Sequence, residues 1–231
     1  MKQTGILDEI NSIFKTKWKI REGRIVPDSD NISLGNDAVK IEGTVLYADM
    51  DDSTGLVNGY KDWFAAEVYK AYLVAACKAI RHEGGEITAF DGDRVMAVFI
   101  GSAMNSSAIK AAMQINYLVG QINNALKNEY PSSAYKLQQT IGIDTSPLFV
   151  AKTGIRNSND LVWVGRAANY AAKLCSLGDS SYSIYITEDV YNRLNNKSKY
   201  GGDPQKNMWE KRIWTKTGLT VYRSNWWWKI S

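Results

Sequence analysis

The chain has 231 residues, 45% of them hydrophobic and 23% charged, which is the composition of one globular domain and excludes a disordered or collagen-like protein. No run approaches the roughly 20 apolar residues of a membrane helix, and the N-terminus lacks the apolar core of a signal peptide. We therefore expect a cytoplasmic protein with no stable membrane insertion. The net charge of +4 is compatible with an anionic ligand but too weak to indicate nucleic acid as a partner.

The N-terminal part begins with an amphipathic pattern over 4–18, which predicts a helix, and continues as a polar connector over 21–36. The periodicity then predicts a strand over 43–50, a loop over 51–59, a helix over 60–83, strands over 86–90 and 95–100, a helix over 104–128 and a strand within 137–150. This β-α-β-β-α-β order is the split arrangement of a ferredoxin-like fold. We therefore predict an α+β, palm-like domain with an antiparallel-containing sheet, helices on one face and a C-terminal extension.

The rest of the chain predicts a strand over 161–164, a helix over 165–177, a strand over 183–187, a short helix and a strand pair over 212–223. The sequence thus divides into an N-terminal helix and connector (1–42), a main domain (43–223) and a tail (224–231). The tail holds Trp226, Trp227 and Trp228. We expect it to close an edge of the core or of a dimer; a patch for a partner or a membrane surface is the alternative.

Two carboxylates end up close together in this topology. Asp49 ends the first core strand, and Asp93 follows the tight turn that Asp91-Gly92 predicts between the two short strands. These strands are neighbours in a split sheet, so the two side chains converge and would repel each other. A pair of divalent cations, Mg²⁺ or Mn²⁺, removes that conflict. The alternative is that Asp49 caps a loop and Asp93 merely occupies the hairpin.

Two polar segments lie elsewhere in the predicted fold. The loop after Asp49 contains Asp52, Ser53 and Thr54 ahead of a helix, and its hydroxyls and N–H groups are a plausible phosphate cradle. In the later helix, Arg166, Asn169 and Lys173 are spaced three and four residues apart and are predicted to share one face. That stripe is either part of a site or simply solvated.

Three ordered segments, VLYADMDDST (45–54), FDGDRVMAVF (90–99) and VGRAANYAAKL (164–174), resemble a class III nucleotidyl cyclase. The resemblance covers about residues 43–222. It implies that Asp49, Asp93 and the carbonyl of Met50 bind two Mn²⁺ or Mg²⁺ ions. It also implies that Asn169 orients the ribose and that Lys173 stands where the family has a transition-state arginine. Lys216 loosely matches the lysine that contacts the terminal phosphates.

The departures from that family concern the base. Purine cyclases carry a lysine where this chain has Ala89, and often an aspartate or threonine where it has Val162. Tyr47, two residues before Asp49, shares its strand face. Together with an Asp-Arg pair, Asp93-Arg94, this pattern resembles the pyrimidine (uridylate) cyclases of bacterial Pycsar anti-phage systems. Tyr47 and Arg94 are alternatively a core aromatic and an edge-strand charge.

The resemblance implies a phosphorus–oxygen lyase that converts a nucleoside triphosphate, best UTP, to cyclic UMP and pyrophosphate as a messenger in anti-phage defence. A cytidylate or adenylate cyclase, or a degenerate nucleotide-binding domain, remains the alternative. It also implies a head-to-tail homodimer in which the aspartates of one subunit meet the asparagine and lysine of the other. The effector that reads the product is not expected to bind directly.

Overall fold

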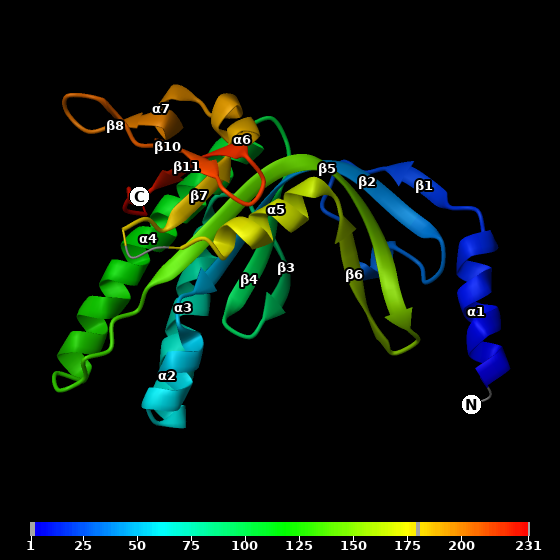
Figure 1. Cartoon of the computed structure of the whole chain (residues 1–231), viewed down its shortest axis with the longest axis horizontal. Helices are drawn as coiled ribbons and strands as arrows, with labels where there is room; N and C mark the ends of the chain where they lie inside the picture. The colour runs from blue at the N-terminus through cyan, green and yellow to red at the C-terminus, as the bar shows by residue number, and fades with distance from the viewer. Residues whose placement is uncertain (1–2, 179–180, 231) are drawn as a thin grey trace.

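The protein is described by a computed structural model, which covers residues 3–178 and 181–230. The outer limits of the predicted domains, residues 1 and 231, lie outside these described residues. A nine-stranded sheet runs in the order β10-β11-β7-β5-β2-β4-β3, with β1 on β2 and β6 on β5 (Figure 1). Its strands are β1 Lys19–Glu22, β2 Asp37–Met50, β3 Glu86–Asp91, β4 Arg94–Phe99, β5 Gln139–Ile155, β6 Ser158–Val164, β7 Ile184–Thr187, β10 Glu210–Trp214 and β11 Leu219–Ser224.

The remaining elements are helices and one small strand pair. The helices are α1 Gln3–Lys15, α2 Ser53–Gly59, α3 Asp62–His82, α4 Met104–Glu129, α5 Arg166–Cys175, α6 Glu188–Arg193 and α7 Asn196–Lys199, with a 3-10 turn over Ser29–Asn31. The pair is β8 Tyr200–Gly201 and β9 Lys206–Asn207. Among the described residues, no helix is long and apolar enough to cross a membrane.

The predicted split unit is confirmed as β2-α3-β3-β4-α4-β5. Its two long strands, β2 and β5, pair antiparallel from Ala38 opposite Ala151 to Met50 opposite Gln139. β4 lies on the other side of β2, also antiparallel, whereas β7 runs parallel to β5. The C-terminal end of β2 and the β3–β4 turn therefore lie at the same end of the sheet.

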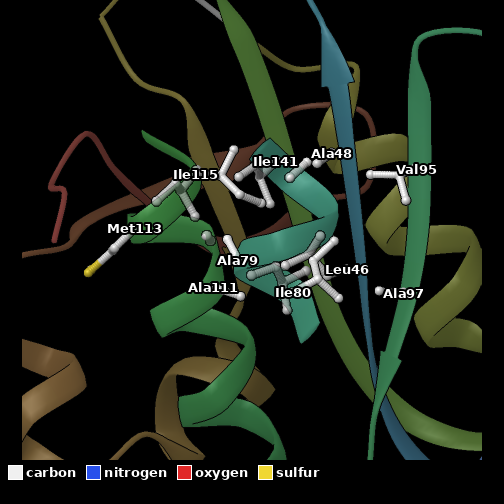
Figure 2. Close-up of a cluster of buried hydrophobic side chains, with 14 of the residues drawn as sticks. Leu46, Ala48, Ala79, Ile80, Val95, Ala97, Ala111, Met113, Ile115 and Ile141 are labelled. Atoms are coloured by element: carbon white, nitrogen blue, oxygen red, sulfur yellow. The ribbon is translucent and has the colours of Figure 1, made fainter. Parts of the chain in front are cut away.

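The main core lies between the sheet and helices α3 and α4. Alternation along β2 directs Leu46, Ala48 and Met50 into this core, where they pack with residues such as Ile80 and Ile141. Figure 2 shows side chains from both helices and from the strands meeting in this layer.

The opposite face of the sheet is covered by α5. Its buried residues include Ala167, Ala168 and Ala171, which pack with Val45, Met96 and Trp163. The expectation of helices on one face thus holds for the split unit, while α5 of the C-terminal extension covers the other face. Tyr47, the alternate residue of β2, packs against this second cluster.

Several segments differ from the sequence prediction, among them the 51–59 loop and the N-terminal connector; α7, β8 and β9 were not predicted either, and β5 runs on to Ile155. The predicted 51–59 loop contains α2, whose first turn is capped by Asp52: its carboxylate accepts a hydrogen bond from the Gly55 N–H at 3.1 Å. The predicted connector contributes β1, which pairs with the start of β2 at Asp37, six residues earlier than predicted. Neither segment has enough apolar periodicity to be detected from the sequence.

The tail packs against the core, in agreement with the expectation that it closes an edge of the domain. The Trp226 ring lies against Gly201, and the Trp228 N–H donates to the Met113 carbonyl at 3.1 Å. The Asn116 side chain donates to the Trp226 carbonyl at 3.0 Å and accepts from Gln139 at 2.6 Å. Because Gln139 pairs with Met50, this chain of hydrogen bonds ends beside the last residue of β2.

Candidate active site

The carboxylates of Asp49 and Asp93 come from adjacent strands at the same end of the sheet. Tyr47 pairs with Met96 and Ala48 with Val95, so Asp49 follows on toward the start of β4. The β3–β4 turn consists of Gly92 and Asp93, and Gly92 has a φ of 61°, which favours glycine. Asp93 therefore lies within the turn, one position earlier than the sequence suggested.

The two acids interact electrostatically. Burial is the main cause that raises the pKa of Asp49 to about 6, and the negative charge of Asp93 adds to it. Arg94 acts in the opposite direction. The structure thus holds two carboxylates in each other's field with incomplete compensation by positive charge.

The donor set fits a divalent cation. Oδ2 of Asp93 is buried and has no hydrogen-bond partner among the described residues. Such an atom costs free energy unless something binds it. No group of three or more acidic, histidine or cysteine side chains within residues 3–178 and 181–230 forms a closed metal cage. Two carboxylates and a carbonyl leave coordination positions for phosphate and water, as Mg²⁺ requires.

Tyr47 and Arg94 lie beside the acids. The Arg94 guanidinium carbon is 5.3 Å from the centre of the Tyr47 ring, and its Nη2 donates to Asp91 at 2.7 Å. Burial raises the pKa of Tyr47 above its usual value. Ala89 packs against the same cluster as Tyr47, whereas Val162 is exposed. This side of the site therefore contains a phenol and a guanidinium. The position at which purine cyclases carry a lysine holds the small side chain of Ala89.

The residues of segment 51–54 have different structural roles. The Thr140 hydroxyl donates to Asp51 at 2.8 Å, and the Asp51 N–H donates to the Gln138 carbonyl at 3.0 Å, which fixes the start of the loop. The Asp52 carboxylate is used as the cap of α2. Ser53 and Thr54 occupy the first turn of α2, close to this loop in sequence, with Thr54 exposed. An open pocket of about 410 Å³ lies between Asp49, Asp51, Asp52 and the end of α5.

Helix α5 presents Asn169 and Lys173 to solvent while its alanines face the sheet. Arg166 is exposed as well, as the helical spacing predicts, but its guanidinium is also bound to the body of the protein: Nε donates to Oδ2 of Asp144 in β5 at 3.1 Å.

Lys216 lies in the β10–β11 turn and is exposed. Val221 pairs with Thr187, and Ile184 lies level with Ile141, which pairs with Ala48. These registers place Lys216 at the end of the sheet opposite Asp49. Within one subunit, Lys216 and the Asp49–Asp93 pair are therefore separated.

Three residues around the acids were not predicted from the sequence as part of the site. Tyr72 of α3 is fully buried, and its hydroxyl has no partner among the described residues. Burial is the main cause that raises its pKa, and the charges of Asp49 and Asp93 add to it. Tyr135 is half-buried, its hydroxyl also has no partner among the described residues, and burial is the main cause that raises its pKa to about 12. The Cys175 thiol at the end of α5 donates to the Thr140 carbonyl at 2.9 Å. None of the three had a sequence signal, because each is recruited by tertiary packing.

Comparisons with known proteins agree with this geometry. A scan of protein-family models gives no match. A uridylate cyclase of Xanthomonas perforans is 52% identical over 98% of this chain and 99% of its own length. A uridylate cyclase of Burkholderia cepacia is 44% identical over 96% of both chains. The crystal structure of the adenylyl cyclase CyaB from P. aeruginosa has a TM-score of 0.69 at 19% identity, over 81% of this chain and 95% of that one. The paired aspartates, the βαββαβ sheet and the near full-length similarity lead to one conclusion: the chain belongs to the uridylate cyclase family and is a nucleotidyl cyclase with the class III fold.

Proposed function

We propose that this protein converts UTP to 3′,5′-cyclic UMP and pyrophosphate, and that the product is a messenger in anti-phage defence. The observation that carries the cyclisation site is the convergence of Asp49 and Asp93, with Oδ2 of Asp93 buried and unpartnered among the described residues. The defence role rests on the resemblance to Pycsar cyclases. The choice of UTP rests on Tyr47, on Ala89 and on the names of the 52% and 44% identical relatives.

Asp49, Asp93 and the Met50 carbonyl would hold two Mg²⁺ or Mn²⁺ ions. When bound, such ions lower the pKa of the attacking 3′-hydroxyl and neutralise charge on the leaving phosphates. These residues suit a cation because the two carboxylates repel each other in the metal-free protein, and a bound cation would neutralise both. Ser53 and Thr54 are the proposed phosphate contacts, and any contribution of Asp52 is through its backbone because its carboxylate caps α2.

The other half of the site would come from a second subunit. Asn169 and Lys173 lie on the solvent face of α5, and Lys216 lies at the opposite end of the sheet from Asp49. In a head-to-tail homodimer, Asn169 of the partner subunit orients the ribose for in-line attack on the α-phosphorus. Lys173 of the partner subunit then places its charge beside the α-phosphoryl oxygens, and the partner's Lys216 binds the terminal phosphates.

Selection of the base is assigned to Tyr47 and Arg94. Tyr47 shares a strand face with Asp49, and its ring is held beneath the Arg94 guanidinium. A tyrosine there shortens the base pocket and offers one hydroxyl, which suits a pyrimidine better than a purine. Ala89 leaves a purine edge without its polar reader, and an unpaired buried polar group weakens binding.

A product assay tests the reaction directly. The protein is incubated with UTP, CTP, ATP or GTP in Mn²⁺ or Mg²⁺, and the products are identified by mass spectrometry. We expect cyclic UMP with UTP and pyrophosphate in equal amount. Cyclic AMP as the main product would contradict the substrate proposal, and nucleotide binding without turnover would contradict the cyclase reaction itself.

Mixing two inactive variants tests the shared sites. Asp49→Ala removes the acid side of each site, and Lys173→Ala removes the basic side. If sites are shared, a mixed dimer contains one site with both halves intact, so equal mixing restores roughly a quarter of the wild-type sites. Each variant alone is the control, and persistent inactivity of the mixture would contradict the trans arrangement.

A further inference from the structure

An ionic cluster around one buried carboxylate connects the N-terminal end of α5 to the sheet. Asp144 of β5 has a side chain with 0% exposure, and Arg166 donates to it through Nε at 3.1 Å and Nη2 at 3.3 Å. The Thr187 hydroxyl donates to the same carboxylate at 2.5 Å. Arg166 also donates to the Thr145 carbonyl at 2.8 Å and pairs with Asp189 of α6. One guanidinium thus joins α5, β5 and α6.

The buried side of α5 lies close to the sheet. At its N-terminal turn this side consists of Ala167, Ala168 and Ala171, and toward the C-terminus Leu174 packs in a separate cluster. Additional polar contacts occur at both ends: the Ser146 hydroxyl accepts from the Ala167 N–H at 2.9 Å, and the Cys175 thiol donates to the Thr140 carbonyl. Polar contacts to β5 thus act together with this packing, and at the N-terminal turn of α5 they are made by Arg166 and the Ala167 N–H.

Arg166 is on the same helix as the two exposed residues that the proposed reaction needs. It precedes Asn169 by three residues and Lys173 by seven, so a shift of the first turn moves both side chains. A misplacement of about 1 Å in a catalytic group is enough to lower a rate on the order of 100-fold.

We propose that Asp144 and Arg166 are positioning residues of the cyclase. Their ion pair sets α5 on β5 so that Asn169 and Lys173 reach the site of the partner subunit. Neither residue touches substrate. This inference rests on the proposed function, because it requires α5 to act on a site whose acids belong to the other chain.

Asp144→Ala is the informative variant. Arg166 keeps Asp189 and is 42% exposed, so its charge remains solvated when Asp144 is lost. We expect kcat to fall on the order of 10- to 100-fold, more than KM for UTP changes, because the interaction lost acts on positioning at the transition state. Asp144→Asn, which keeps the acceptor oxygen, is expected to retain more activity. Glu86→Gln, which removes an exposed ion pair with Arg81, is the control with unchanged kcat.

Mixed dimers separate positioning from general damage to the fold. Asp144→Ala mixed with Asp49→Ala should regain activity, because the acids of the first chain meet an intact α5 from the second. Asp144→Ala mixed with Lys173→Ala should not, because each site then contains a defective α5. A merely structural defect would also impair the acid half of the Asp144→Ala chain and would prevent the first recovery.

The control mixtures distinguish failure of the positioning role from failure of the shared site. If Asp49→Ala and Lys173→Ala recover activity together but Asp49→Ala and Asp144→Ala do not, the positioning role is wrong and the shared site stands. If neither pair recovers, the trans arrangement fails and this inference fails with it. If Asp144→Ala does not fold, the same mixtures are made with Asp144→Asn, and wild-type kcat in that variant would show that the charge of Asp144 does not position α5.

Discussion

Asp49 and Asp144 are both aspartates on the two central strands, and their surroundings differ in kind. Asp144 has 0% side-chain exposure, yet a guanidinium and a hydroxyl bind its carboxylate. Asp49 is less buried, but the charge with the largest influence on its pKa is another carboxylate, that of Asp93. Burial raises the pKa of both groups, and only at Asp144 do hydrogen bonds and a guanidinium oppose burial so extensively. The Asp144 carboxylate thus has its partners within the fold, whereas the Asp49–Asp93 pair retains negative charge that a ligand can bind.

The largest effect is expected at the unpaired acids. Asp93→Asn and Asp49→Asn should each lower kcat on the order of 1,000-fold or more, because an amide loses the charge that holds a cation. The measurement is cyclic nucleotide formed per minute from UTP. Asp62→Asn, a change of an exposed aspartate in α3, is the matched control and should retain activity. Substantial turnover by either site variant would refute the metal assignment.

Arg166→Ala removes the guanidinium that pairs with Asp144. It leaves the Asp144 carboxylate buried with the Thr187 hydroxyl as its remaining side-chain donor, so the free energy of unfolding should fall by about 3 kcal/mol. Urea denaturation measures it. Lys173→Ala, on the exposed face of the same helix, should change stability by less than about 0.5 kcal/mol. Equal stability of the two variants would mean that the Asp144 carboxylate is satisfied without Arg166.

Gly142→Ala tests the close contact of α5 with β5. A Cβ at this position would lie 2.0 Å from the Ala171 carbonyl oxygen and 2.5 Å from the Cys175 nitrogen, which are backbone atoms that cannot rotate away. The helix must move, at a cost of about 1–3 kcal/mol in stability. Since α5 carries Lys173, kcat should fall as well. Gly120→Ala in α4, where nothing lies within 4 Å, is the control.

The smallest effect is a pH dependence of the metal-free protein. Because the folded-state pKa of Asp49 is raised to about 6 from 3.8, the folded protein binds more protons than the unfolded chain between these values. Stability due to Asp49 is therefore present at low pH and lost as pH rises through 6. Asp49→Asn removes this loss, so its advantage over wild type should grow by about 1 kcal/mol from pH 5 to pH 7, after allowance for solvent screening. Chelator-treated samples in urea give the comparison, and a constant difference would contradict it.

Local sequence pattern was enough to predict the split sheet and the meeting of Asp49 with Asp93. Strand alternation, the Asp-Gly turn and the β-α-β-β-α-β order are all short-range signals, and topology then makes neighbours of β2 and the β3–β4 hairpin. The placement of Asn169 and Lys173 on an exposed face followed from helical spacing in the same way.

Long-range partners were beyond such patterns. Helical spacing correctly placed Arg166 on the exposed face with Asn169, but it could not show that the guanidinium binds Asp144, which lies 22 residues earlier in the chain. Tyr72 lies on a helix whose periodicity identifies it as core but does not show that its hydroxyl is near the acids. The short helix α2 escaped prediction because Gly55, Asn58 and Gly59 make it weakly helical and its cap, Asp52, has a φ of 53°.

The hydrogen-bonded tail has a practical consequence for anyone handling the protein. Residues 225–228 are joined to α4 through Met113 and Asn116, and through Gln139 to the strand beside Met50. A purification tag or fluorescent fusion attached directly after them would pull on the same bonds that border the reaction centre. Helix α1, with every described side chain exposed, offers an attachment point remote from those bonds.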